Sequence, residues 1–345
     1  MTRLRNSPGD YVPPADVADG SIVSVFRVPP EVAGMRLDLF VKSQLRRTSR
    51  TRTQEIIALS AYSHEGKRLR SNDRVYAEQE IFLWRAPWDE TPVPTDIPVV
   101  YEDEHFLAVN KPANLPVHPT ARYHNNTLIM LMKAERPGEF LTLAHRIDRE
   151  TSGVLLVAKS AACDRALKRQ LELREGIEKV YSAITWGVPT SASGDSRFRH
   201  VQSVELDVDS RYKVKMRVGI TETALFAATQ FEVLETAQAL GKSYARVSCL
   251  IETGRQHQIR VHLMSLGTPI VGDKLYGPDE SAFARSADGE LTLDDLEMLE
   301  LPRHALHASR MSLRHPITGV DLTIEAPWPA DMKAFWEGLA SEPRT

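Results

Sequence analysis

The stretch from Leu143 to Ser160 sets a cluster of charged residues directly before an apolar run. Val154 to Ala158 is short and apolar throughout, which predicts a strand buried on both faces. Asp148 precedes this run and lies between Arg146 and Arg149. Because a carboxylate that leads into a buried strand is costly to place without partners, the pattern indicates that other groups hold Asp148. Such a carboxylate is either part of a functional site or half of a structural ion pair, and the stretch alone leaves both interpretations open.

The composition is typical of a globular protein with more than one domain. The chain has 345 residues, of which 42% are hydrophobic and 26% are charged, and this length is enough for two domains that each bury a core. The formal net charge of -3 gives no sign of a nucleic-acid partner. Any argument for such a partner therefore has to come from local clusters of basic residues.

The sequence gives no sign of a metal site, a disulfide framework or a membrane segment. Cys163 and Cys249 are the two cysteines, and we expect both to be reduced and packed. His257 and His262 are spaced so that a helix would not place them on one face, which disfavours a metal site. No apolar run approaches the roughly 18 residues of a membrane span, and residues 1–8 lack an apolar signal region. We expect a cytoplasmic protein.

Changes of composition along the chain predict five segments. Prolines concentrate in residues 1–20 and again between Pro87 and Pro98, which is typical of a loosely ordered tail and of a semi-rigid linker. The expected segments are a flexible tail at 1–20, a small module at 21–88, a linker at 89–96, a larger domain at 97–330 and a C-terminal tail at 331–345.

A basic run lies between two predicted helices of the small module. Apolar spacing predicts one helix over 37–45, and Ser49 is placed to cap the next. Residues 75–84 read as paired strands. The segment from Lys42 to Gln54 contains no acidic residue, so it is either a solvated helix face or a patch that binds phosphates. The residues that we expect to contact RNA phosphates are Arg46, Arg47 and Arg50.

Residues 211–217 form a second basic cluster. Basic residues alternate strictly with other residues, so an extended strand would place Arg211, Lys213, Lys215 and Arg217 on one face. Four like charges on one face repel each other unless a partner neutralises them. A phosphate backbone is one such partner, and a solvated edge strand protected by its charge is the alternative. We expect Lys213 and Lys215 to contact RNA.

Several different short motifs lie along the larger domain. They are Asn110-Lys111-Pro112, His145-Arg146-Ile147-Asp148 with Thr151-Ser152-Gly153, Lys179-Val180-Tyr181, Thr253 to His262, and Gly272 to Gly277. Together they resemble the motifs of the RluA-type RNA pseudouridine synthases. Ile147 stands where that family has leucine, and Gln256 stands where it has threonine. The resemblance covers residues 97–330 closely.

The resemblance implies an α+β fold, with a pseudouridine synthase-like mixed, largely antiparallel sheet, flanking helices and a cleft across the sheet. It implies the isomerisation of uridine to pseudouridine in structured RNA without a cofactor. Large-subunit ribosomal RNA is the expected substrate and transfer RNA is the alternative. Residues 34–84 more loosely resemble the small α/β RNA-binding module first described in a small-subunit ribosomal protein. We expect the protein to act as a monomer.

The resemblance also implies roles for individual residues. Asp148 is the expected nucleophile or proton acceptor, and Arg260 is the arginine paired with it. Tyr181 is expected to stack on the target base, for which an aromatic ring is well suited, and it is a possible base. Arg146 is placed to fill the gap left by an extruded base. Lys111 is either a phosphate contact or a structural cation.

Two other classes of function remain to be weighed. A non-catalytic RNA-binding protein would retain the basic clusters but would lose one of Asp148, Tyr181 or Arg260, and none is lost. A glycosidase-type hydrolase usually needs two carboxylates that flank the bond to be cleaved. The central motif supplies one such carboxylate, Asp148, and Glu150 follows two residues later.

Overall fold

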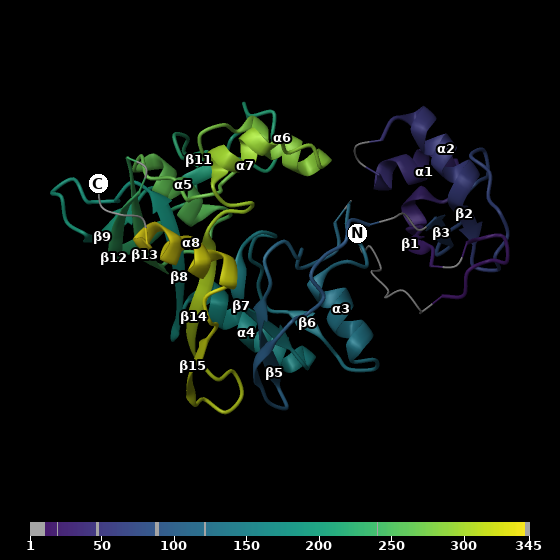
Figure 1. The fold of residues 1–345 in the computed structure, drawn as a ribbon. Coiled ribbons are helices and arrows are strands. Elements are labelled where there is room, and N and C mark those ends of the chain that lie inside the picture. Colours follow the sequence, from purple (N-terminus) through teal and green to yellow (C-terminus); the bar gives the residue numbers. More distant parts are fainter. Residues whose placement is uncertain are drawn as a thin grey trace. The chain divides into compact units, whose positions relative to one another are not determined.

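The computed structural model describes residues 11–18, 20–45, 48–86, 90–120, 122–239 and 241–341. The chain forms two compact units, Met1–Asp89 and Glu90–Thr345 (Figure 1). Most of the expected linker at 89–96 belongs to the second unit. There the carboxylate of Glu90 accepts hydrogen bonds from the backbone N–H groups of Asn125 and Asn126.

The N-terminal unit is a three-stranded antiparallel sheet with two helices, and its strand order is β1-β3-β2. Ser49 caps the second helix as expected, because its hydroxyl accepts a hydrogen bond from the N–H of Arg52 at 3.2 Å. The strand expected over 75–84 begins only at Glu80, since Glu78 adopts a positive φ of 65° that interrupts the extended backbone. The elements are β1 (Ile22–Arg27), the 3-10 turn Pro30–Val32, α1 (Leu37–Gln44), α2 (Arg50–Ser60), β2 (Ala61–Ser63) and β3 (Glu80–Arg85).

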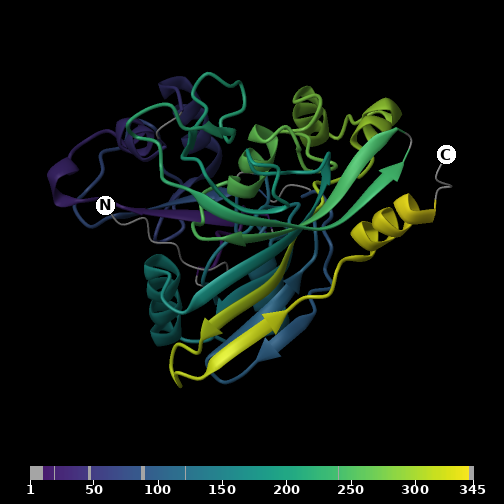
Figure 2. The same cartoon turned by 90° about the vertical axis from the view of Figure 1, so that its left-hand side faces the viewer.

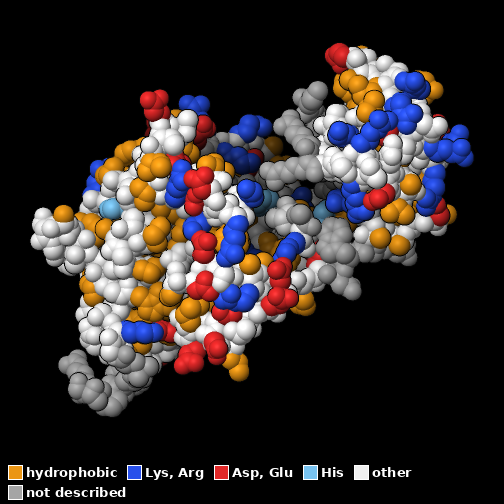
Figure 3. All heavy atoms as spheres, turned by 90° about the horizontal axis from the view of Figure 1, so that it is seen from above, with side chains coloured by type: hydrophobic (Ala, Val, Ile, Leu, Met, Phe, Trp, Pro, Cys, Tyr) orange, Lys and Arg blue, Asp and Glu red, His pale blue; other side chains and the backbone are white. Residues whose placement is uncertain are grey.

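The basic run of this unit is partly neutralised. Arg50 forms an ion pair of 3.0 Å with Asp38, whose side chain is fully buried, and hydrogen bonds from Arg36 and Gln54 reach the same carboxylate. Arg46 and Arg47 lie outside the described residues. Figure 3 shows Lys and Arg side chains (blue) gathered on the visible face of this unit. A phosphate-binding role for the run therefore stays a prediction.

The larger unit is built on a ten-stranded sheet with the order β4-β5-β7-β14-β8-β13-β12-β9, in which β15 also pairs with β14 and β6 with β7. The pairing of β7 with β14 is parallel and the other pairings are antiparallel. The mixed, largely antiparallel α+β fold is thereby confirmed. Figure 2 shows the twist of the sheet between the β14–β15 hairpin (yellow) and the β12–β13 pair (green).

The strands of this sheet are β4 (Val99–Glu102), β5 (Phe106–Lys111), β6 (Thr142–Leu143), β7 (Ser152–Ala158), β8 (Ile177–Trp186), β9 (Arg197–Val201), β12 (Ala228–Ala239), β13 (Lys242–Ile251), β14 (Leu306–Arg314) and β15 (Asp321–Glu325). A separate antiparallel pair consists of β10 (Val204–Leu206) and β11 (Met216–Val218). The helices are α3 (Leu128–Glu135), α4 (Ala161–Leu173), α5 (Gln258–Ser265), α6 (Ser281–Asp288), α7 (Leu293–Leu299) and α8 (Ala330–Ser341). None of the helices in the described ranges is long and apolar enough to cross a membrane.

Strand β7 lies in the middle of the sheet and every one of its residues is buried, as the apolar run predicts. Its parallel contact with β14 pairs Gly153 with Ala308. Gly153 has a φ of 109°, and a Cβ atom at this position would lie 2.2 Å from the carbonyl oxygen of Ala308. Only glycine fits this close approach, which fixes the backbone just after the Asp148 loop.

The strand expected over residues 211–217 is wrong. Residues 211–215 form turns and coil, and β11 begins only at Met216. Arg217 forms ion pairs with Glu205 at 3.0 Å and with Asp209 at 2.9 Å, and Lys215 pairs with Glu280. Carboxylates of the same unit therefore pair with Lys215 and Arg217, and the contact of Lys213 and Lys215 with RNA stays a prediction.

The expected C-terminal tail is also wrong for residues 331–341, which belong to helix α8. Met332 is fully buried in the main core, and Phe335 and Leu339 pack against the same core. Arg303 donates two hydrogen bonds to Asp331, at 2.7 and 2.8 Å. The apolar face and this ion pair together hold the helix on the larger unit. Residues 342–345 lie outside the described part of the chain.

Candidate active site

A pocket of about 340 Å³ opens on the larger unit, within the size range of small-molecule sites. Three segments that are distant in sequence form its walls: the loop before β7, the strand β8, and the turn that leads into α5. Four of the expected site residues line this pocket, namely Arg146, Asp148, Tyr181 and Arg260. Lys111, Lys213 and Lys215 do not line it.

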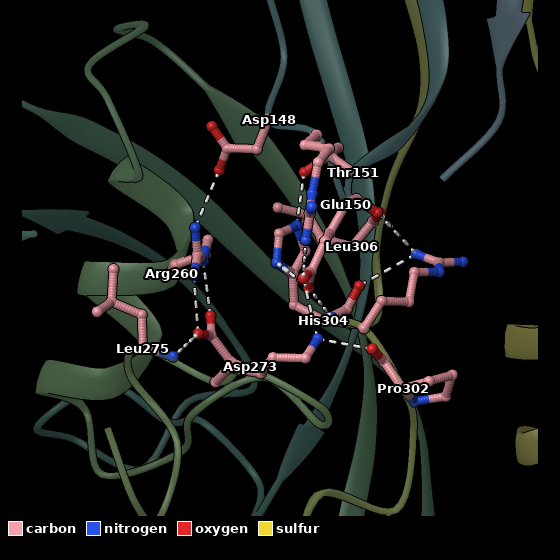
Figure 4. Close-up of polar contacts among 12 residues, drawn as sticks. Asp148, Glu150, Thr151, Arg260, Asp273, Leu275, Pro302, His304 and Leu306 are labelled. Atoms are coloured by element: carbon pink, nitrogen blue, oxygen red, sulfur yellow. Dashed lines mark hydrogen bonds and ion pairs between the residues drawn. The ribbon is translucent and has the colours of Figure 1, made fainter. Parts of the chain in front are cut away.

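Asp148 lies in the loop between β6 and β7 and its side chain is 30% exposed. Its Oδ2 accepts a hydrogen bond of 3.1 Å from Nη1 of Arg260. The other carboxylate oxygen points away from the arginine (Figure 4). Asp148 therefore has one oxygen fixed by a cation and one oxygen available to a molecule in the pocket.

Arg260 is itself held by a second carboxylate, that of Asp273. Nε of Arg260 donates to Oδ2 of Asp273 at 2.6 Å, and Nη2 donates to Oδ1 at 2.8 Å. The two side chains are 7% and 0% exposed. Oδ1 of Asp273 also accepts from the N–H groups of Leu275 and Tyr276, both at 3.0 Å. This two-point contact fixes the guanidinium plane and aims its third nitrogen at Asp148.

The buried pair remains charged. Burial alone would raise the pKa of Asp273, but the charge and hydrogen bonds of Arg260 outweigh it and the pKa lies below its usual value. Burial would likewise lower the pKa of Arg260, and the attraction of Asp273 and then of Asp148 raises it instead. Sequence reasoning missed Asp273, although its signal was present as part of the motif from Gly272 to Gly277.

His257 lies beside the carboxylate of Asp148, just before α5, with a left-handed φ of 55°. Its Nε2 is 3.8 Å from Oδ2 of Asp148, and its Nδ1 is 2.8 Å from the hydroxyl of Tyr276. That hydroxyl accepts a hydrogen bond from the N–H of Met216, so its own proton is free to be donated to Nδ1. Burial, together with the charge of Arg260, lowers the pKa of His257 to about 4, so the imidazole is neutral at pH 7 and its N–H faces Asp148.

Tyr181 lies on β8 and is almost fully buried in the pocket wall. Burial raises the pKa of its phenol, and the negative charge of Asp148 raises it further. The phenol is therefore protonated at neutral pH. In this state the ring offers an apolar face to a planar base, and the hydroxyl is a hydrogen-bond donor.

Lys111 is a structural cation, and the alternative of a phosphate contact is wrong for the state described. Its side chain is fully buried, and its ammonium donates to the carbonyls of Pro112 at 2.7 Å and of Leu115 and Arg149 at 2.9 Å. Burial lowers its pKa well below the usual value. Because Arg149 follows Asp148 directly, these bonds tie the end of β5 to the Asp148 loop.

Glu150 is not a second carboxylate of the pocket. Its Oε1 accepts a hydrogen bond of 2.9 Å from Lys274, and its Oε2 accepts from the N–H of His304 at 3.2 Å. The hydroxyl of Thr151 lies 2.8 Å from Nε2 of the same histidine. Figure 4 shows this group of residues on the far side of the Asp148 loop from Arg260. The site therefore lacks the paired carboxylates that glycoside hydrolysis usually requires.

Arg146 is exposed at the pocket, one position after the half-buried His145 and two positions before Asp148. It is the residue of the loop that is best placed to meet a polymer entering the site. Within the described ranges, no group of three or more His, Cys, Asp or Glu side chains is arranged to hold a metal ion.

Known proteins of one family resemble this chain. Residues 105–265, which include Asp148, Tyr181 and Arg260, match the family model described as RNA pseudouridylate synthase. The chain is 32% identical to ribosomal large subunit pseudouridine synthase D of Pseudomonas aeruginosa over 88% of this chain and 92% of that protein. It is also 32% identical to the protein of the same name from Xylella fastidiosa, over 88% of this chain and 89% of that one.

Among solved structures, human RNA pseudouridylate synthase domain containing 4 superposes with a TM-score of 0.53 and 26% identity, over 72% of this chain and 95% of that one. The sequence relatives and the structural neighbour share the domain that carries the pocket. The chain belongs to the RNA pseudouridine synthase family.

Proposed function

We propose that this protein converts uridine to pseudouridine in large-subunit ribosomal RNA, with Asp148, Tyr181 and Arg260 as the residues that carry the reaction. The observation that carries the proposal is the Asp148–Arg260 pair in a pocket that Tyr181 also lines. The names of the relatives from Pseudomonas aeruginosa and Xylella fastidiosa support the large ribosomal subunit as the source of the substrate.

The reaction breaks the bond between N1 of uracil and C1′ of ribose, rotates the base and joins C5 to C1′; C5 loses its proton and N1 gains one. Asp148 is the one carboxylate among the residues that line the pocket. Its oxygen that is free of Arg260 is the atom that attacks the sugar or takes a proton. Arg260 orients this carboxylate, and Asp273 in turn orients Arg260.

Tyr181 serves as the platform for the uracil ring. Stacking on an aromatic side chain contributes about 1–3 kcal/mol per base. The raised pKa of the phenol favours a stacking and donor role over a role as the base that removes the C5 proton. Arg146, exposed beside the pocket, is assigned to the space that the target nucleotide leaves in the RNA when it is extruded.

The proposal is tested with transcripts that carry tritium at C5 of uridine, because tritium leaves only when C5 forms its new bond. Large-subunit ribosomal RNA and a pool of transfer RNA transcripts are incubated separately with the protein and with the Asp148→Asn variant. We expect tritium release from the ribosomal transcript with the wild-type protein alone, and mapping of the product names the uridine.

If tritium were released from transfer RNA alone, the proposed reaction would stand and the proposed substrate would be wrong. A folded protein that binds both RNAs and releases no tritium from either would be a non-catalytic RNA-binding protein, and the proposal would fail. Release of free uracil would identify a hydrolase instead. We further propose that the N-terminal unit binds RNA through the run that contains Arg50, that residues 97–330 are the catalytic domain, and that the protein acts as a monomer in the cytoplasm.

A further inference from the structure

Lys179 is a further cation in the wall of the pocket, and the proposed chemistry does not use it. It lies on β8 two positions before Tyr181, so both side chains project from the same face of the strand. Both line the pocket. The ammonium group of Lys179 is therefore beside the aromatic ring of Tyr181, on which we propose that the target base stacks.

The ammonium of Lys179 has no counter-charge among the residues that the structure describes. No carboxylate of the described residues forms an ion pair or hydrogen bond with it, whereas Lys159 pairs with Glu102 and Lys274 pairs with Glu150. Burial, with the positive charge of Arg174, lowers the pKa of Lys179 to about 8. A half-buried cation without a partner is unfavourable in the free protein, which suggests that its partner arrives with a ligand.

The charges around the pocket indicate the chemistry of that ligand. Its lining contains the cations Arg146, Lys179, Arg255 and Arg260, and Asp148 is the one acidic residue among them. Arg260 is already matched by Asp148 and Asp273. The remaining excess of positive charge favours an anion over a neutral carbonyl of the base, and every nucleotide of an RNA brings one phosphate.

We propose that Lys179 binds one of the two phosphates that flank the target uridine and so holds the extruded nucleotide against Tyr181. This inference rests on the proposed function, since it takes the pocket to be the site of the target nucleotide. It assigns to Lys179 a role in binding the RNA, separate from the carboxylate chemistry of Asp148.

The test pairs Lys179→Met with RNAs that carry a single methylphosphonate, which removes the charge of one linkage. A short stem-loop around the mapped uridine is made with the neutral linkage on its 5′ side, on its 3′ side, or two nucleotides away. Single-turnover rates measured over a range of protein concentrations give the concentration for half-maximal rate and the maximal rate for each combination. Lys133→Met is the control, because Lys133 is a half-buried lysine on α3 that does not line the pocket.

We expect Lys179→Met to raise the half-maximal concentration on unmodified RNA by about tenfold, as for loss of a charged hydrogen bond, and to change the maximal rate less. On the RNA with the contacted phosphate neutralised, the variant and the wild type should have equal half-maximal concentrations. Lys133→Met should match the wild type on every RNA. Lys179→Gln, which removes the charge with a polar side chain, should reproduce the result.

The inference would be overturned if Lys179→Met raised the half-maximal concentration by the same factor on all four RNAs. It would also be overturned if the half-maximal concentration on unmodified RNA did not change. Thermal unfolding provides a second readout, since loss of an unpaired cation should leave the melting temperature unchanged or higher. A fall in melting temperature with additive kinetics would assign Lys179 a structural role. Failure of the wild-type protein to convert uridine in any RNA would refute the proposed function itself, which is a different outcome.

Discussion

Asp273→Asn offers a sharp test of how the site is held together. The substitution keeps the shape of the side chain and removes its charge. The N–H groups of Leu275 and Tyr276 both donate to Oδ1, so the carboxamide will keep its oxygen there. Its NH₂ group then faces Nε of Arg260, which in the wild type donates to Oδ2 at 2.6 Å. Two donors meet, and Arg260 retains Asp148 as its one carboxylate.

The size of the effect follows from burial. Removing one partner of a buried ion pair lowers the free energy of unfolding by about 3–5 kcal/mol. For a domain of this size each kcal/mol shifts the melting temperature by roughly 2–4 °C, so the lower figure predicts a fall of about 6–12 °C. Arg260 will turn toward Asp148 and occupy its free oxygen, and a misplacement of this kind costs about 10²-fold in rate.

The assay measures thermal unfolding and single-turnover tritium release on the same preparation, at a temperature where the variant is folded. Asp331→Asn is the matched control. Arg303 contacts Asp331 with the same two-point geometry, through hydrogen bonds of 2.7 and 2.8 Å, and this pair does not line the pocket. The control should lower the melting temperature and leave the rate within about twofold. An Asp273→Asn protein with reduced stability and the wild-type rate would show that Asp273 supports the fold alone, and the positioning argument would be wrong.

The pH dependence of stability provides an independent check on whether the charge of Asp273 stabilises the folded protein. The pKa of Asp273 in the folded protein lies below its usual value of 3.8, so its charge contributes stability above that value, and this contribution is lost as the pH falls through the folded pKa. The difference in melting temperature between wild type and Asp273→Asn should be constant from about pH 8 to pH 5 and should narrow only at lower pH.

The other predictions concern the carboxylate, its arginine and the two basic clusters. Asp148→Asn should reduce conversion to background while RNA binding survives, as measured by tritium release and a filter-binding assay; multiple turnover in the folded variant would contradict the assignment. Arg260→Lys should lower the single-turnover rate strongly, because one ammonium cannot contact Asp148 and Asp273 with fixed geometry. Removal of residues 1–89 should leave a folded unit whose RNA affinity depends less steeply on salt. Lys215→Glu should lower the melting temperature more than Lys213→Glu, because among the described residues Lys215 pairs with Glu280 and Lys213 has no ion pair.

Local features were predictable from the sequence because neighbouring residues determine them. The buried strand β7 and the cap at Ser49 each depend on a few adjacent positions. Helix α8 was equally local, since Met332, Phe335 and Leu339 recur at helical spacing, and the expectation of a tail overlooked that signal.

Alternation of charge, in contrast, predicted the wrong structure at residues 211–217. A strand with four bare cations would need an external partner, but the chain supplies Glu205, Asp209 and Glu280 as partners for two of them, Lys215 and Arg217. Nothing within the basic cluster announces these partners. The same holds for Lys111, whose three carbonyl acceptors include that of Arg149, 38 positions away.

The site itself is non-local, and this explains what a single sequence could and could not show. Asp148 and Arg260 are 112 positions apart, so their contact could be inferred from the family resemblance but not from periodicity or spacing. Asp273 follows Arg260 by 13 positions, across the end of α5 and a turn, where neither helical nor strand periodicity links two residues. The structure thus adds a chain of three charged groups in which each orients the next. A carboxylate that must be free at one oxygen and fixed at the other requires such a chain, because an arginine without Asp273 would be free to occupy both oxygens of Asp148.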